Sequence, residues 1–294
     1  MTLTGSSPIP MCTQRDWQLA SRVMALTSVR RLGDYCQAFQ GEINETTDGK
    51  KGFVSYKAGD GPLVMRGSMI CMYAAREASQ GEPMYLREQK YLKGKPDSAK
   101  ARHHEVRRIG WQESSALNNF RRIIAGPISK GVYCNHKINY IPETTSKLPL
   151  DFVLALLNSS ISDWFFRLQS TNAAVSHYQV LELPAPTIGC DDATPRDRQY
   201  AVDSKKYADI AERLCAAMTE PGVVPAWVMQ EIANFSRAIQ KIESLRVLQA
   251  RSERSRLAPD SQRIQDAIDQ VLFHYLGLAV EDATYIHTRL TEML

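Results

Sequence analysis

Side chains that could read the edges of DNA bases are spread over the first two thirds of the chain. Arginine can pair with a guanine through two hydrogen bonds, and asparagine or glutamine can pair with an adenine in the same way. Lysine suits phosphate oxygens as a point charge, and it fixes register rather than sequence. The candidates for contact with double-stranded DNA are Arg66, Lys90, Lys93, Lys95, Arg107, Arg108, Asn118, Asn119, Arg121, Arg122, Lys130, Asn135, Lys137, Asn139, Asn172, His177 and Tyr178.

Many of these candidates belong to a basic segment, residues 87–137. The segment carries 12 lysines and arginines against 4 acidic residues, whereas the whole chain has a net charge of only +4 and a pI of about 8.7. A solvated basic face is the plain alternative. Aromatic and amide side chains are interleaved with the charges, and this favours contact with nucleic acid.

Two positions within the basic segment predict a division of labour. Arg121 and Arg122 precede an apolar run, so we expect them at the end of a buried strand, where side chains alternate between faces. Only one of the two is then expected to read a base. Lys93 and Lys95 lie in a loop flanked by glycine and proline, and we expect them to contact phosphates. The polar loop 172–178 is the strongest candidate for a functional loop, although it could be a simple connection between a helix and a strand.

Catalytic signatures are missing from the sequence. An amino-methyltransferase needs an Asn/Asp-Pro-Pro-aromatic segment to hold the exocyclic amine of a flipped base, and this chain has no Pro-Pro dipeptide. No strand-glycine-helix fingerprint for S-adenosylmethionine is visible either, because residues 59–62 (GDGP) read as a turn. The sequence therefore assigns no catalytic, cofactor-binding or metal-binding residue.

A metal-dependent nuclease is the alternative function. Asp60, followed by Glu88 and Lys90, could imitate two carboxylates that hold Mg²⁺ and a lysine near the attacked phosphate. Such combinations arise easily by chance. The histidines and cysteines lack the paired spacing of a structural zinc site.

Composition and cysteine usage indicate an ordinary globular protein. The 294 residues are 44% hydrophobic and 23% charged. No apolar run approaches the ~20 residues of a membrane span, and no secretory signal is visible, so we expect no membrane partner. The six cysteines form no CxxC pair, which favours reduced thiols and a cytoplasmic location.

Hydrophobic patterns predict an α+β fold in three segments. Residues 1–30 are expected to form a leader or linker with a helix. Residues 31–188 form a mixed, β-rich domain with one internal helix near 150–168, where apolar residues recur every three or four positions. Residues 196–294 form a helical C-terminal region. Its third helix is expected to begin at Pro259 and to stop at Gly277.

Four motifs occur in an order that resembles one family. They are residues 41–46 (GEINET), 62–67 (PLVMRG), 108–112 with 118–125 (RIGWQ and NNFRRIIA), and 156–159 through 164–166 to 183–186 (LLNS, WFF and LPAP). This order is similar to the TaqI-like C-terminal specificity domain, the target recognition domain of adenine-specific DNA methyltransferases in restriction-modification systems. Residues 29–36 resemble the opening of type I specificity subunits. Gly110 departs from the family pattern because it interrupts an expected β run.

The resemblance implies a DNA-recognition module without its catalytic half. The methyltransferase core and its S-adenosylmethionine would belong to a partner subunit or to a missing N-terminal domain. The chain would then be either a separate specificity subunit or a fragment of a longer enzyme. The DNA target, the methylated base and the presence of a nuclease partner stay open.

Overall fold

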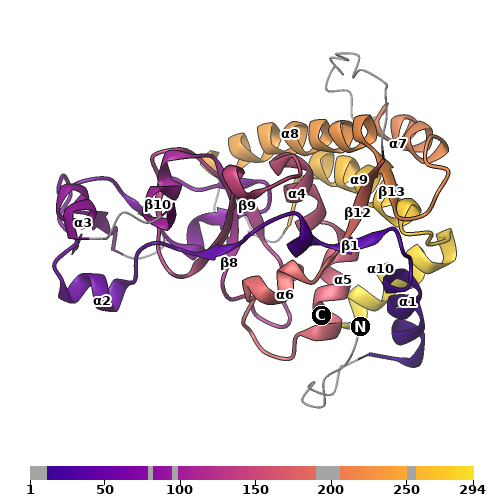
Figure 1. Cartoon of the computed structure of the whole chain (residues 1–294), viewed down its shortest axis with the longest axis horizontal. Helices are drawn as coiled ribbons and strands as arrows, with labels where there is room; N and C mark the ends of the chain where they lie inside the picture. Colours follow the sequence, from indigo (N-terminus) through magenta and orange to yellow (C-terminus); the bar gives the residue numbers. More distant parts are fainter. Residues whose placement is uncertain (1–11, 79–81, 95–98, 190–205, 250–255) are drawn as a thin grey trace.

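The computed structural model describes residues 12–78, 82–94, 99–189, 206–249 and 256–294. Helices and several small sheets both contribute, which confirms the predicted α+β class. The molecule is elongated. Figure 1 shows α2 (Glu45–Lys50) and α3 (Glu88–Gly94) at one end of its long axis, and α1 (Gln14–Met24), α7 (Lys206–Ala216) and α10 (Val280–Glu292) at the other.

The central sheet has four antiparallel strands in the order β2 (Phe39–Gln40), β11 (Ile138–Pro142), β8 (Arg108–Gln112) and β9 (Ala125–Ile128). All five residues of β8 are buried. Gly110 does not interrupt this strand, contrary to the expectation from the sequence. It lies in the middle of β8, where a Cβ atom would collide with the Ile128 side chain of the neighbouring strand.

The expected helix near 150–168 is two helices, α4 (Leu150–Leu157) and α5 (Ser160–Gln169). Asn158 separates them because its amide bonds to both backbone groups of Ala125, at 3.0 and 3.1 Å. The Ser159 hydroxyl then accepts the amide of Ser162 and caps α5. The apolar spacing runs through this break, so periodicity alone could not reveal it.

The three helices expected in the C-terminal region are present as α7, α8 (Ala226–Gln249) and α9 (Pro259–Tyr275). Gly277 stops α9 with a φ of +67°, a conformation that glycine adopts at little cost. The helices pack on the β-rich part, with α4 against α8 and α9.

The first helix, α1, is part of the same core. Its side chains Leu19 and Val23 are buried there, and Asp16 accepts a hydrogen bond of 3.0 Å from the Trp164 indole. One hydrophobic cluster therefore includes residues from all three segments that the sequence suggested. A three-stranded sheet of β1 (Val29–Arg31), β12 (Pro184–Gly189) and β13 (Val223–Pro225) joins them as well.

Several other elements are short. Among them are the hairpin strands β5 (Ile70–Cys71) and β6 (Ala74–Ala75), the helix α6 (His177–Leu181), and 3₁₀ turns at Leu32–Asp34, Gly67–Met69, Ala99–Glu105 and Glu143–Thr145. No helix in the described part of the chain is long and apolar enough to cross a bilayer. The five cysteines within the described ranges are free thiols, and Cys190 lies outside those ranges.

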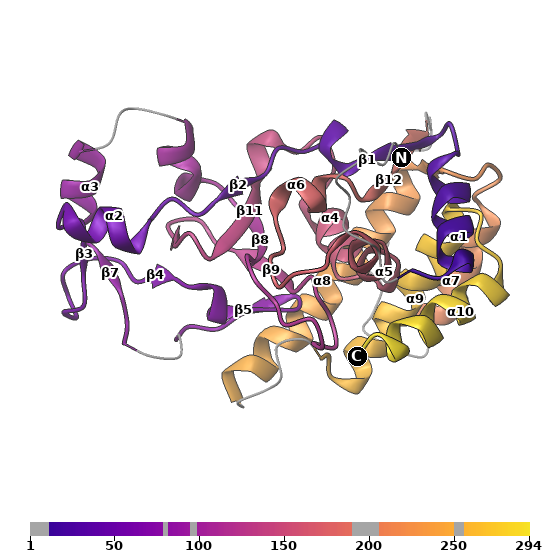
Figure 2. The ribbon, with the colours of Figure 1, turned by 90° about the horizontal axis from the view of Figure 1, so that it is seen from below.

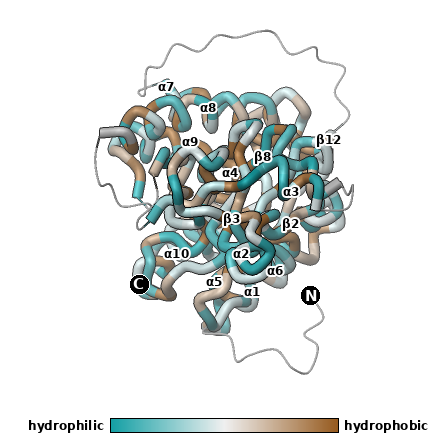
Figure 3. Tube along the Cα trace, turned by 90° about the vertical axis from the view of Figure 1, so that its left-hand side faces the viewer, coloured by the Kyte–Doolittle hydropathy of each residue, from teal (hydrophilic) through white to brown (hydrophobic). Residues whose placement is uncertain are grey.

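A second, smaller core defines what we call the distal lobe. It consists of α2, α3, β3 (Val54–Ser55), β4 (Val64–Met65), β7 (Tyr85–Leu86) and β10 (Tyr133–Cys134). Eight buried side chains fill it, among them Ile43, Phe53 and Tyr91. Figure 3 views the molecule from this end, and α2 in the foreground is mostly hydrophilic. The lobe therefore combines a small apolar interior with a hydrophilic helix, α2, at its end.

A buried ion pair fastens the distal lobe to the central sheet. The Glu42 carboxylate pairs with the Arg108 guanidinium on β8, and both side chains are fully buried. Glu42 also accepts the amide of Cys134 at 3.0 Å. The adjacent Gly41 is required because a Cβ atom there would collide with the carbonyl of Asn135. Asn44 then caps α2 by accepting the amides of Thr46 and Thr47, at 3.1 and 3.0 Å.

Candidate nucleic-acid interface

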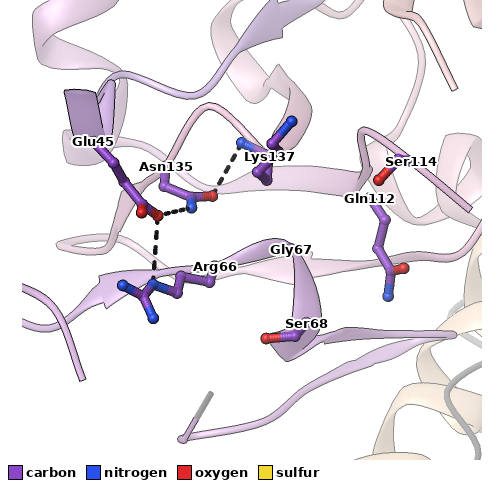
Figure 4. Close-up of a pocket in the computed structure, with 8 residues that line it drawn as sticks. All are labelled: Glu45, Arg66, Gly67, Ser68, Gln112, Ser114, Asn135 and Lys137. Carbon is purple, nitrogen blue, oxygen red and sulfur yellow. Dashed lines mark hydrogen bonds and ion pairs between the residues drawn. The ribbon is translucent and has the colours of Figure 1, made fainter. Parts of the chain in front are cut away.

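A polar pocket of about 480 Å³ opens where the distal lobe meets the central sheet. Figure 4 shows the residues that line it, which come from four separate stretches of sequence. Three predicted residues, Arg66, Asn135 and Lys137, come together here. The full lining is Glu45, Arg66, Gly67, Ser68, Gln112, Ser114, Asn135 and Lys137.

Glu45 contacts two other residues of the pocket, Arg66 and Asn135 (Figure 4). Its carboxylate lies 3.5 Å from Arg66 Nε and accepts a hydrogen bond of 2.6 Å from the Asn135 amide. The Asn135 carbonyl oxygen in turn accepts the backbone amide of Lys137 at 3.1 Å. Both ends of the buried Asn135 side chain are therefore used by the protein, so it is poorly placed to read a base itself.

The opposite wall comes from the end of β8. Gln112 is buried, and its amide donates to the carbonyl of Ile70 at 2.8 Å. Lys137 is exposed and pairs with Glu113 at 3.2 Å. Gly67 lies against the carbonyl of Lys137, where a Cβ atom would come within 2.7 Å. This close approach keeps the two walls together.

The loop 172–178 runs beside this wall. Ser115 donates its amide to the carbonyl of Ala173 at 2.8 Å, and Val175 donates to the carbonyl of Glu113 at 2.7 Å. At the end of the loop, Tyr178 is 73% exposed and its ring lies 4.0 Å from that of His177. Burial, and then the nearby Lys100, lower the pKa of His177. The loop thus presents the exposed ring of Tyr178 beside the imidazole of His177.

Two predicted phosphate contacts lie on the distal lobe. Lys90 and Lys93 are exposed on α3, which Figure 2 shows at the far end of the molecule from α1. The Lys90 ammonium lies over Gly52, next to the exposed Lys51. Lys95 lies outside the described residues. Compact, exposed ammonium groups of this kind suit phosphate oxygens.

Arg121 and Arg122 do not have the exposure that base reading requires. They precede β9 rather than ending a strand, and both are buried. Arg121 donates to the Ser160 hydroxyl at 2.8 Å, and Arg122 donates to the carbonyl of Asn172 at 2.6 Å. The backbone amide of Arg122 donates to Asp163 at 2.6 Å. In this conformation the two arginines hold internal segments together, and the expectation that one of them reads a base is corrected.

Three other candidates serve the interior or its edge. Arg108 forms the buried pair with Glu42, and Asn139 donates to the carbonyl of Val175 at 3.0 Å. Arg107 is part-buried and pairs with Asp151. Arg108 and Asn139 are therefore removed from the accessible set.

The remaining candidates lie at or near the surface. Asn118, Lys130 and Asn172 are exposed, and Asn119 is partly buried, with its amide donating to the Ser115 hydroxyl at 2.9 Å. The pocket also includes residues that the sequence did not single out, namely Glu45, Ser68, Gln112 and Ser114. Glu45 and Gln112 fall inside two of the four motifs, which is the signal that could have indicated them.

The residues of the alternative nuclease site have other partners. Asp60 accepts from the Ser55 hydroxyl at 2.6 Å and pairs with Arg87 at 3.1 Å, and these contacts lower its pKa. Glu88 accepts from the Tyr133 hydroxyl at 2.8 Å. Within the described ranges, no group of three or more His, Cys, Asp or Glu side chains is arranged to hold a metal ion.

No protein-family model matches the sequence, and no curated protein matches it. Among solved structures, the chain is similar to the type IIL restriction-modification enzyme MmeI, solved in complex with DNA (TM-score 0.43, 11% identity), over 92% of this chain and 36% of that one. It is also similar to the type IIG restriction endonuclease BpuSI (TM-score 0.42, 10% identity), over 92% of this chain and 34% of that one. The chain thus spans about a third of the length of each enzyme. At this identity, neither similarity assigns a role to any residue here.

Proposed function

We propose that this chain is the sequence-specific DNA-recognition domain or subunit of a restriction-modification adenine-specific DNA methyltransferase, and that it lacks the catalytic core. The observation that carries the proposal is the polar pocket between the distal lobe and the central sheet. There Arg66 and Lys137 meet at an open site, beside the exposed loop 172–178. The motif order in the sequence supports the same function.

The arrangement supports a division between reading and positioning. Recognition of a base edge requires side chains with a fixed orientation, and contacts within the protein fix the orientation of polar side chains in the pocket. The exposed lysines of α3 suit the phosphate backbone. The proposed catalytic partner is a methyltransferase domain or subunit that binds S-adenosylmethionine.

DNA titrations with the purified chain test this function. We expect binding of duplex DNA that weakens steeply between low and moderate salt, since contacts to phosphates release counterions. We expect no methyl transfer from labelled S-adenosylmethionine until a catalytic partner is added. Methyl transfer by the chain alone would refute the proposed division, and absence of duplex binding at low salt would refute the DNA-recognition function.

A second function, a metal-dependent endonuclease, is tested in the same reactions by adding Mg²⁺. The pairing of Asp60 with Arg87 argues against it, because a carboxylate that already serves an arginine is a poorer metal ligand. Cleavage that depended on Mg²⁺ and disappeared in Asp60→Asn would favour the nuclease.

A further inference from the structure

Arg66 differs from the other candidate arginines because the protein holds only part of its guanidinium. Its side chain is 18% exposed, which places it between the buried Arg108 and the exposed surface cations. Nε faces Glu45 at 3.5 Å, and Nη1 donates to the carbonyl of Glu82 at 2.9 Å. Among the described residues, Nη2 has no partner. The outer edge of the guanidinium is therefore available to a ligand in the pocket.

Glu45 and Asn135 fix the direction in which this edge points. The Glu45 carboxylate is held by the Asn135 amide at 2.6 Å, and Asn135 is only 2% exposed. Glu45 also lies in the first turn of α2, whose N-terminal end favours a negative charge. A carboxylate fixed on one side of the Arg66 guanidinium restricts the rotation of that group. A guanidinium that is already restricted loses less conformational entropy when it binds a ligand.

We propose that Arg66 reads a guanine in the major groove, and that Glu45 and Asn135 are its positioning residues. The inference rests on the proposed function. Guanine presents two acceptors there, O6 and N7, which match a pair of parallel N–H donors. The Nη1 and Nη2 groups at the outer edge of Arg66 supply such a pair, because Nη1 carries a second proton beyond the one given to Glu82.

The carboxylate next to Arg66 favours a base over a phosphate at this guanidinium, and the Lys137 ammonium of the same pocket is already paired with Glu113 at 3.2 Å. A phosphate that approached Arg66 would also approach the Glu45 carboxylate, and like charges at this range repel. The edge of a guanine carries no net charge and does not incur this repulsion. The exposed ammonium of Lys93 on α3 provides a matched cation on the same lobe for the phosphate role.

The test begins with selection of sequences from a randomised duplex pool by the full wild-type chain. Each enriched guanine is then replaced by 7-deazaguanine, which removes the N7 acceptor and keeps base pairing. We expect one enriched guanine whose replacement weakens wild-type binding about tenfold. The same replacement should have no effect on Arg66→Met, which keeps the aliphatic stem and has no donor for a base.

Two control variants separate the possible outcomes. Glu45→Gln should reduce the preference for guanine at that position and leave the other enriched positions unchanged. Lys93→Ala should weaken all duplexes alike. If wild type and Arg66→Met respond equally to every 7-deazaguanine, or if no enriched guanine is sensitive in wild type, the role of Arg66 is refuted while DNA recognition stands. If the pool yields no enriched sequence, the proposed function itself fails. The wild-type arm depends on no variant, so the absence of a sensitive guanine would count against the proposal even if a variant misfolded.

Discussion

Glu42 and Arg108 carry opposite charges in a place that water does not reach. Removing one partner from such a pair leaves an uncompensated charge, whereas removing both leaves none. The two residues are also the link between the distal lobe and β8, 66 positions apart in sequence. At the scale of single residues, this pair is where a small change should have the largest effect on folding.

We expect Arg108→Met to lower the free energy of unfolding by about 3–5 kcal/mol, the cost typical of breaking a buried pair. The double variant Arg108→Met with Glu42→Met should lose less than the sum of the two single variants. Urea denaturation of wild type, the two single variants and the double variant measures the coupling. Arg30→Ala, at an exposed position, is the control that should change little. Additive losses would show that the pair is not coupled.

Replacement of Arg122 should affect the stability of the fold without affecting the recognition of DNA sequences. Its guanidinium donates to the carbonyl of Asn172 and lies over the Phe166 ring, 5.3 Å from the centroid. We expect Arg122→Ala to destabilise the fold by about 1–3 kcal/mol, because a buried side chain loses its hydrogen bond to Asn172 and its packing on Phe166. The ranking of DNA sequences should stay as in wild type when binding is measured well below the melting temperature. A changed preference at one base pair would instead restore Arg122 as a reader.

At the scale of elements, the Asn158 side chain makes hydrogen bonds to β9 that the backbone of an adjacent strand would otherwise make. Its amide satisfies both backbone groups of Ala125 at the start of β9, and so ends α4 at the same point. A side chain that replaces both backbone partners must have an acceptor and a donor, and the asparagine amide supplies them on two neighbouring atoms.

We expect Asn158→Leu, which keeps the branching at Cγ, to cost about 1–3 kcal/mol because the buried Ala125 amide loses its acceptor and the Ala125 carbonyl keeps only the Tyr73 amide. Thermal unfolding followed by circular dichroism checks this. Ser244→Ala on the exposed face of α8 is the matched control. An unchanged melting temperature for Asn158→Leu would mean that water or a neighbouring group replaces the amide.

His103 makes the packing of the turn Ala99–Glu105 sensitive to pH. It is buried against the Tyr140 hydroxyl at 3.1 Å and the Phe39 ring, and burial, followed by the charges of Arg108 and Lys100, lowers its pKa from 6.5 to about 4. Between these values the unfolded chain binds a proton that the folded chain does not. Stability from this group is therefore fully present above pH 6.5 and is lost as the pH falls toward 4.

Stability measured from pH 7 to pH 4 should fall for wild type and should fall less for His103→Gln. The pKa of Asp151 is also lowered, but from 3.8, so its contribution is lost only below this window. Equal slopes for the two proteins would show that His103 does not keep its neutral form in the folded state.

At the scale of the whole molecule, two hydrophobic clusters of unequal size set the stability of two regions. The distal lobe has eight buried side chains in its own cluster, whereas the main cluster runs from α1 through the central sheet to α10. Fewer buried contacts mean cheaper local opening. We expect amides of β3 and β7 to exchange with deuterium faster than those of β8 and β11, as measured by mass spectrometry. Equal protection in both regions would mean that they unfold together.

The sequence predicted the fold class and the C-terminal helices because apolar spacing is a local signal that burial preserves. It also led to three of the pocket residues, Arg66, Asn135 and Lys137. It could not reveal which arginines are buried, because Arg121 finds Ser160, and Arg122 finds Asn172, only after the chain has folded. Residues such as Glu42 and Asn158, which belong to the resembling motifs, have clear structural duties. In this chain these motif positions indicate a fold more directly than they indicate a contact with DNA.

The loop 172–178 is attached to the protein mainly through its main chain. The carbonyl of Val175 accepts from both the Trp111 indole and the Asn139 amide, at 3.1 and 3.0 Å, and the carbonyl of Asn172 accepts from Arg122. Every amino acid offers the same carbonyl, so these attachments do not depend on which side chains the loop carries. Exposed residues of the loop, such as Ala173 and Tyr178, can therefore be substituted by natural mutation or by design. The main-chain hydrogen bonds that attach the loop to the protein would stay the same.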